Sequence, residues 1–259
     1  MTRQTFSKWL ASFIFMAFVA SNSALAENIE RKFDVAAGGA LNLKTDAGSV
    51  KVLTHKAPTA IVEVKIKGRD ANEFELVTEL KGSTLEVVGE IDGRGWNRNL
   101  RVEFTVTVPQ QFDVEIDTAG GSINVADLEG NLSAETSGGS IRIGSIRGAV
   151  ELNTSGGSIS TEEVYGPLNA HTSGGSIRAT FAEQLTENAV LDTSGGSITA
   201  YLVSDVKIEL NASTSGGRVK TDFEVDGRIK KQSIRGEING GGPELRLRTS
   251  GGSVSVRVL

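Results

Sequence analysis

Apolar and polar residues alternate in fixed columns around a threonine that recurs along most of the chain. Counted from this threonine, the positions four and two residues before it and five residues after it are apolar in nearly every copy. In one repeat these positions hold Val150, Leu152 and Ile159. The position directly before the threonine varies among polar residues, as Asn153 and His171 illustrate. This alternation predicts short β-strands with one face in a core and the other in water.

The columns belong to a six-residue motif, TSGGSI, and its looser forms TDAGSV, TAGGSI, TSGGRV and TSGGSV. The motif begins at Thr45, Thr118, Thr136, Thr154, Thr172, Thr193, Thr214 and Thr249. Copies follow one another at 18 residues from Thr118 to Thr172 and then at 21 residues as far as Thr214. Because one repeat is too small to bury its own apolar face, we expect the repeats to stack as the rungs of a solenoid.

The fold class that this pattern predicts is all-β: a single-stranded, right-handed parallel β-helix with rungs of 18–21 residues. A left-handed hexapeptide helix requires an aliphatic residue every six positions, which the columns do not provide. A calcium-binding β-roll needs Asp in its glycine-rich loops, where this chain has Ser or Arg. We expect SGG to form a corner in which glycine takes a positive φ, and Thr and Ser hydroxyls to bond to the backbone.

The N-terminus has the pattern of a secretory signal peptide over residues 1–26. Arg3 and Lys8 precede an apolar run over residues 9–20, and Ala24 and Ala26 occupy the small-residue positions of a cleavage site. This leader predicts an exported protein, most simply periplasmic, with the cell surface or secretion as alternatives. No second long apolar segment follows, so we expect no integral membrane segment in the mature chain.

Charge and cysteine content narrow the choice of partners. The formal net charge is −5 for the whole chain and −7 once the leader with its two basic residues is removed. An acidic protein of this size is not expected to bind nucleic acid. The chain has no cysteine, so an exported form must be held together by its core and its backbone hydrogen bonds alone.

Two further segments follow the leader. Residues 27–112 contain longer strands without the regular period, and we expect irregular rungs and an N-terminal β cap of the same solenoid; a separate antiparallel subdomain is the alternative. Residues 113–259 form the regular repeat, in which SIRGEI at 233–238 is expected to be a degenerate rung. Val254, Val256 and Val258 then lie on one face of an exposed final rung. We expect this rung to be covered by a partner, by a second copy in an end-to-end homo-oligomer, or by the N-terminal strands.

The run VEFTVTVPQQFDVEIDTAGGSI, followed by repeated TSGGSI, resembles the bacterial DUF4097 family of exported, adhesin-like proteins with β-strand repeats. The resemblance covers most of the mature chain. It implies a right-handed β-solenoid in an exported or envelope-associated protein, and it implies little chemistry, because a fold does not define a function.

The sequence predicts no catalytic, cofactor or metal site. His171 stands in the variable outward column, and His55 lies in a turn without a recognisable partner. The Ser and Thr columns are repeated, whereas a nucleophile is usually singular and has a base beside it. Glu162 and Glu163 are adjacent and point to opposite sides of a strand. We therefore expect no catalytic residue, no cofactor, no metal and no enzyme.

One segment departs from the repeat and is the candidate ligand site. DGRGWNRN holds Trp96 with Arg94 and Arg98, and Arg101 follows closely. An aromatic ring flanked by arginines can dock a sugar or an anionic envelope polymer. The alternative is a loop whose Trp covers the side of the solenoid.

Two classes of function remain. The first is a non-catalytic cell-envelope protein, adhesin-like or structural, that binds a glycan, a surface or a protein partner. The second is a β-helix carbohydrate-active enzyme, a polysaccharide lyase or glycoside hydrolase, which needs carboxylates clustered on one face. Ice binding by a threonine array is disfavoured, because these threonines stand at corners.

Overall fold

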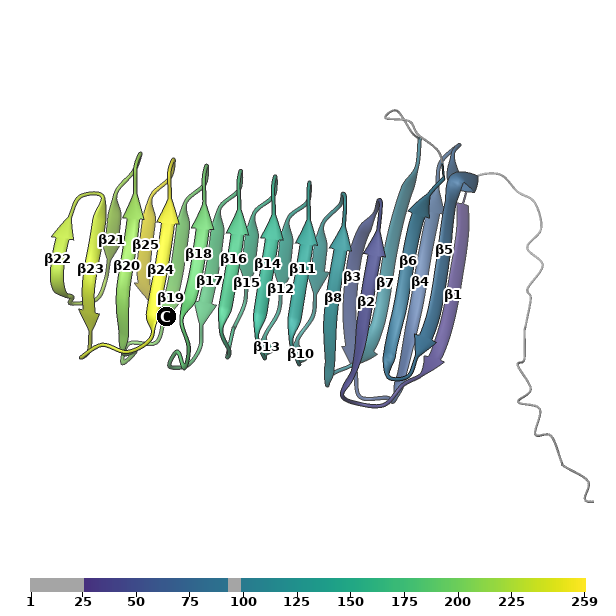
Figure 1. Cartoon of the computed structure of the whole chain (residues 1–259), viewed down its shortest axis with the longest axis horizontal. Coiled ribbons are helices and arrows are strands. Elements are labelled where there is room, and N and C mark those ends of the chain that lie inside the picture. The colour runs from purple at the N-terminus through teal and green to yellow at the C-terminus, as the bar shows by residue number, and fades with distance from the viewer. Residues whose placement is uncertain (1–25, 93–98) are drawn as a thin grey trace, which may run out of the picture.

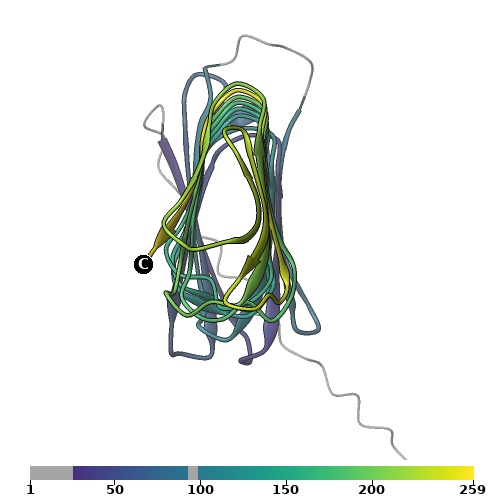
Figure 2. The same cartoon turned by 90° about the vertical axis from the view of Figure 1, so that its left-hand side faces the viewer.

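The computed structural model describes residues 26–92 and 99–259 as a β-solenoid built from two long facing sheets. Figure 1 shows the strands stacked side by side along one axis, and Figure 2 shows the coils end-on. Within the described ranges the helical structure is one 3-10 turn, η1 (Ala71–Glu73), and no helix is long and apolar enough to cross a membrane.

The two sheets, named here A and B, contain 11 and 12 strands. In spatial order, sheet A consists of β1 (Ala26–Asp34), β4 (Thr59–Lys67), β7 (Arg101–Pro109), β3 (Ser49–His55), β9 (Ile123–Val125), β12 (Ile141–Ile143), β15 (Ile159–Thr161), β17 (Ile177–Phe181), β19 (Ile198–Leu202), β25 (Val254–Val258) and β21 (Val219–Thr221). Sheet B consists of β22 (Asp226–Lys230), β23 (Ser233–Ile238), β20 (Ile208–Thr214), β24 (Glu244–Thr249), β18 (Ala189–Thr193), β16 (Leu168–Thr172), β14 (Val150–Thr154), β11 (Leu132–Thr136), β8 (Phe112–Thr118), β2 (Gly39–Thr45), β6 (Thr84–Ile91) and β5 (Phe74–Lys81).

Each regular rung follows the motif. A strand of sheet B ends at the motif threonine, SGGS turns the corner, and the residue after it starts a strand of sheet A. Successive rungs pair in parallel with equivalent residues opposite each other, as Thr136 with Thr154 and Ile141 with Ile159. A short third side contains β10 (Leu128–Glu129) and β13 (Ile146–Arg147). The predicted parallel β-solenoid with short rungs is confirmed.

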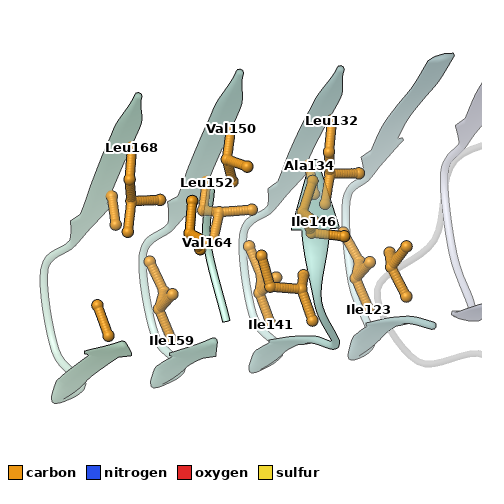
Figure 3. Packing of buried hydrophobic residues seen from close by; sticks show 14 of the residues in the cluster. Ile123, Leu132, Ala134, Ile141, Ile146, Val150, Leu152, Ile159, Val164 and Leu168 are labelled. Carbon is orange, nitrogen blue, oxygen red and sulfur yellow. The ribbon is translucent and has the colours of Figure 1, made fainter. Parts of the chain in front are cut away.

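The apolar columns form the core (Figure 3). Leu152, Ile159 and Leu168 are each at most 1% exposed, and their counterparts in the other rungs are buried in the same way. Because equivalent side chains stack directly along the axis, each rung covers the apolar face of the next. The inward and outward assignment of these columns is confirmed, except at Ile229.

The motif threonines are buried and join consecutive rungs. Thr154 Oγ1 donates a hydrogen bond to the carbonyl oxygen of Gly139 in the preceding rung at 2.7 Å, and accepts one from Gly157 N in its own rung at 3.3 Å. Serine adds a second ladder, since Ser158 N donates to Ser140 Oγ at 3.2 Å. The predicted hydrogen bonds between Thr and Ser hydroxyls and the backbone are confirmed, and they satisfy backbone groups that the corner removes from the sheets.

The reason for the paired glycines differs from the expectation of positive φ. Only Gly48 and Gly121 among the motif glycines have a positive φ, of 122° and 108°. The second glycine of each later motif instead lies against the backbone of the neighbouring rung: a Cβ at Gly139 would stand 1.9 Å from the carbonyl oxygen of Gly121. A Cβ at the first glycine, Gly138, would meet nothing within 4 Å. The corner therefore selects glycine for close approach, chiefly at the second position.

The strands before residue 112 continue both sheets. β2 and β3 form a coil that pairs in parallel with β8 and β9. Beyond it β6 and β7 also pair in parallel, but β4, β1 and β5 are added antiparallel. Phe74 and Phe104 pack edge to face inside this end, with ring centroids 6.1 Å apart. The division of the chain at residue 112 stays a prediction.

The C-terminal end differs from the expectation in two ways. Residues 233–238 are not a degenerate rung, because β23 pairs antiparallel with β20, and with β22 forms a hairpin at the end of sheet B. Ile229 in that hairpin is 61% exposed.

The last rung of the sequence is not the last rung of the solenoid. β24 lies between β18 and β20, and β25 lies between β19 and β21. Val254 and Val256 are fully buried as a result, whereas Val258, which lies beyond the residues paired with β21, is 42% exposed. The expectation of an exposed C-terminal rung is therefore wrong: residues of the preceding coil cover it, not a partner, a second copy or the N-terminal strands.

The two glycines of one corner give a matched test of close approach. Gly139→Ala places a methyl group against backbone atoms that cannot move independently, and we expect it to lower the free energy of unfolding by about 1–3 kcal/mol. Gly138→Ala should change it by less than about 0.5 kcal/mol. Urea denaturation of both variants measures the difference, and equal losses would contradict the proposed role of the second glycine.

The column assignment is tested by an inward and an outward substitution. Leu152→Asp puts an unpaired carboxylate among stacked aliphatic side chains and should cost more than about 3 kcal/mol of folding free energy. His171→Asp, on the exposed face of β16, should cost at most about 1 kcal/mol, because the new carboxylate stands opposite Asp192 but remains in water. Thermal denaturation followed by circular dichroism checks both, and a similar loss in the two variants would refute the assignment.

Candidate functional site

The ligand site predicted from the sequence lies largely outside the described residues. Arg94, Trp96 and Arg98 belong to the undescribed stretch. Arg101 is described, at the start of β7, where its exposed side chain forms an ion pair with Glu103 at 2.9 Å between Nε and Oε1. A role for these four residues in binding stays a prediction.

A shallow groove of about 490 Å³ crosses the outer face of sheet B. It runs across neighbouring strands near their first residues, where side chains such as Ala40, Ala149 and Pro167 are small. The outward residues three positions before the motif threonines line the same groove: Asn42, Glu115, Ser133, Glu151 and Asn169, on β2, β8, β11, β14 and β16. The groove therefore repeats its lining once per rung along the solenoid axis.

Two further lining residues stabilise the rungs themselves. Asp113 Oδ1 accepts a hydrogen bond from Asn131 N at 2.7 Å, and Asn131 Oδ1 accepts one from Ala149 N at 3.0 Å. This side chain to backbone ladder fixes the floor of the groove. The groups left for a ligand are mainly the carboxylates of Glu115 and Glu151, which only accept hydrogen bonds, and the amides of Asn42 and Asn169, which both donate and accept. Glu151 Oε1 also accepts a hydrogen bond from Asn153 Nδ2 at 3.4 Å, which leaves its second oxygen for a ligand.

A second groove of about 360 Å³ lies on the outer face of sheet A. Its charged lining is mixed, with Lys51 and Arg142 opposed by Asp127 and Glu162. Asp127 is already used structurally, since its Oδ1 accepts a hydrogen bond from Ser145 N at 2.9 Å. The mixture of signs gives this groove no net preference for one charge.

The two tyrosines of the chain each contact an arginine. The Arg147 guanidinium lies over the Tyr165 ring at 3.7 Å from its centroid, and the Tyr165 hydroxyl donates to Glu163 Oε2 at 2.7 Å. That hydrogen bond and partial burial raise the pKa of the Tyr165 phenol. Tyr201 instead accepts a hydrogen bond from Arg178 at 2.9 Å. Both contacts pair residues of adjacent rungs on the solenoid surface, so they account for these side chains without a ligand.

Neither histidine lines either groove. His55 Nε2 lies 2.6 Å from the carbonyl oxygen of Thr59, within the turn that joins β3 and β4. His171 is exposed on β16. In the part of the chain that the structure describes, no three His, Asp or Glu side chains are grouped so as to hold a metal ion.

The sequence did contain a signal for the groove on sheet B. The column three residues before the motif threonine is polar from Asn42 to Asn169 but changes to Val190 and Arg246 in the next two rungs of sheet B. The column five residues before it stays small or polar over the same rungs. These two columns together indicate the groove, but they are weaker patterns than the apolar core columns and the single Trp of the candidate ligand segment.

Comparisons with solved structures give distant neighbours. A protein of Clostridium sporogenes provisionally described as a cell adhesion protein matches at 13% identity and a TM-score of 0.39, over 90% of this chain and all of that one. A provisionally named adhesin of Bacteroides fragilis matches at 14% and 0.38, and a Parabacteroides distasonis protein provisionally described as lipid binding at 15% and 0.37. Both matches cover 90% of this chain, together with 97% of the Bacteroides fragilis protein and 96% of the Parabacteroides distasonis protein.

No curated protein matches the sequence. A family model matches residues 99–257. This range includes β7, the regular rungs, the hairpin of β22 and β23, and the coil of β24 and β25. Those residues make up more than half of the chain, and its β-solenoid architecture is that of the matching family. The chain belongs to the Toastrack DUF4097 family.

Proposed function

We propose that the protein is a non-catalytic binding module of an exported, envelope-associated protein, and that the groove on sheet B holds an extended polymer. The supporting observation is the translational repeat of the lining from Asn42 to Asn169 across five neighbouring strands. A surface that repeats at the strand spacing of ~4.8 Å presents equivalent groups to successive units of a long chain. Four strand spacings give a site about 19 Å long.

The chemistry of the lining favours a polymer rich in hydrogen-bond donors. Glu115 and Glu151 accept hydrogen bonds and repel anions, and no Lys or Arg of the described residues lines the groove. Hydroxyl groups of a neutral glycan or ammonium groups of an amino sugar provide the matching donors. This preference is opposite in charge to the one expected of Arg94, Trp96 and Arg98, so the two candidate sites predict different ligands.

A catalytic role for the same pair is less well supported. Two strand spacings separate Glu115 from Glu151 by about 9.6 Å at the backbone, near the outer limit for the carboxylates of inverting glycosidases. Both side chains are exposed on an open sheet face, which offers no walls to enclose a sugar and exclude water. A binding function needs neither enclosure nor a single convergent centre.

Binding by chain length and charge tests the proposal. We expect oligomers of chitosan and neutral β-glucan to bind the mature chain, with affinity rising until the oligomer spans about 19 Å, and alginate not to bind. The double substitution Glu115→Gln and Glu151→Gln should weaken binding at least tenfold, to judge from about 1.5–3 kcal/mol per charged hydrogen bond. Isothermal titration calorimetry measures these affinities.

Glu135→Gln is the matched control, because Glu135 is an exposed carboxylate of the same sheet that does not line the groove. Unchanged affinity of the double variant would refute the groove as the site. Loss of binding in Trp96→Ala alone, with preference for alginate, would assign the site to the arginine-flanked Trp instead. Release of new reducing ends would establish the enzyme alternative.

A further inference from the structure

The two ends of sheet B carry strands with a neighbour on one side only among the described residues. β5 ends the sheet beside β6, and β22 ends it beside β23, as Figure 1 shows at opposite ends of the molecule. An edge strand presents unpaired backbone donors and acceptors to another chain. Val77 on β5 and Ile229 on β22 are among the few large apolar side chains that are strongly exposed, at 57% and 61%.

The outer faces of these ends differ in charge, one being acidic and the other weakly basic. On β5 and β6, Glu75 stands opposite Glu90 and Glu79 opposite Glu86, with Lys81 bridging the second pair. Neighbouring like charges on a sheet are unfavourable unless an opposite charge is close. The outer face at this end is therefore predominantly acidic.

At the other end, Arg228 on β22 stands directly opposite Arg235 on β23, and Lys230 follows on the same face. None of these three cations has an ion pair within the described part of the chain. Asp226 and Glu237 stand opposite each other on this face, so the end hairpin has three cations against two carboxylates. At the opposite end of the same sheet, four carboxylates stand against Lys81.

We propose that the molecules associate head to tail, with β22 of one copy pairing antiparallel with β5 of the next. The direction follows from the topology: β22 runs parallel to the regular strands of sheet B after two antiparallel steps, whereas β5 runs opposite to them after one. Copies stacked by translation along the axis then bring these edges together as an antiparallel pair, the commoner kind of strand pairing.

The register follows from side-chain parity and charge. Ile229 lies on the core side of its strand, opposite buried Ile234, so it must face Leu76, Thr78 or Leu80, the inward residues of β5. With Ile229 opposite Thr78, Arg228 faces Glu79 and Asp226 faces Lys81. A shift of two residues either way replaces one attraction by a repulsion: Asp226 meets Glu79, or Arg228 meets Lys81. In the favoured register Ile229 lies between Leu76 and Leu80, which are only partly buried in the single molecule.

The ends of sheet A show why sheet B forms the contact. The edge strand β1 directs Glu27 and Arg31 to the core side, since they stand opposite buried Ile66 and Val62. Inward charges on an edge strand disfavour pairing with another chain. β5 carries no inward charge; its inward residues are Phe74, Leu76, Thr78 and Leu80.

The lengths of the two sheets are compatible with stacking. Beyond the coil of β2 and β3, sheet B adds two strands and sheet A adds three; beyond the coil of β20 and β21, sheet B adds two and sheet A none. Between the coils of consecutive copies there are then four added strands in sheet B and three in sheet A. A head-to-tail contact of this kind does not close on itself, so it propagates into a filament.

Sedimentation velocity on the mature chain tests the proposal at increasing protein concentration. We expect a series of species that grows with concentration and recedes at high salt, because the contact includes charge pairs. Arg228→Glu and Glu79→Arg should each weaken association at least about tenfold by placing like charges opposite each other. Arg248→Glu, an exposed arginine on the internal strand β24 of the same sheet, is the control and should leave association unchanged.

An equimolar mixture of the two charge variants provides the decisive measurement. Where β22 of the Arg228→Glu variant meets β5 of the Glu79→Arg variant, the two substituted side chains pair with their charges exchanged. Where β22 of the Glu79→Arg variant meets β5 of the Arg228→Glu variant, the original Arg228 and Glu79 pair. Both contacts pair opposite charges, so association should return to within a few-fold of the unmodified chain. In addition, Lys230→Cys with Val77→Cys in one chain should form disulfide-linked ladders on oxidation, since these positions face each other in the proposed register and the chain has no other cysteine.

Three results would overturn the proposal. The first is a monomer at all concentrations, and the second is no recovery of association in the mixture. The third is a double cysteine variant that gives no disulfide-linked products beyond those that Lys230→Cys gives alone. A monomer that binds phosphatidylglycerol vesicles, with binding lost in Arg228→Glu and unaffected by Glu79→Arg, would assign the basic hairpin to an anionic lipid surface instead. Circular dichroism of each variant confirms that the solenoid remains folded.

Discussion

The architecture depends on the close approach of backbones at the SGG corner. The second glycine of one rung lies so near the carbonyl of the next that a single methyl group would not fit. That approach lets the motif threonine reach the neighbouring glycine carbonyl and the motif serine reach the neighbouring serine amide. With the corner fixed, the strands on both sides keep equivalent positions of successive rungs opposite one another, and the apolar columns pack against each other along the axis.

This constraint explains how much of the fold the sequence could reveal. A corner that repeats without change forces a constant register, so burial in the regular rungs could be read from the columns around Thr118 to Thr193. The physical reason for the glycines could not, because a turn with positive φ and a close contact between rungs select the same residue. Only the three-dimensional structure distinguishes these two reasons. It shows that Gly139 lies against a neighbouring backbone, whereas Gly138 has open space around it.

The two ends were less predictable for a different reason. The order of strands in the sequence does not predict their order in space when a hairpin is added or a later coil is inserted between earlier ones. Ile229 and Ile234 both occupy apolar positions, but only Ile234 has strands on both sides of it. The candidate groove was obscured similarly: Glu115 and Glu151 are ordinary surface carboxylates separately, and they become a site only because parallel stacking sets them on one line, two strands apart.

The placement of β24 and β25 has a consequence for how the native state is reached. The coil of β20 and β21 carries its own motif and the same apolar columns, so it can stack directly on β18 and β19 before the later coil exists. In the native order the later coil of β24 and β25 stands between these two coils instead. The same apolar columns are therefore compatible with two stacks that differ by one coil. Pairing between segments far apart in the sequence is slow to form, so we expect insertion of the last coil to be a slow step of folding.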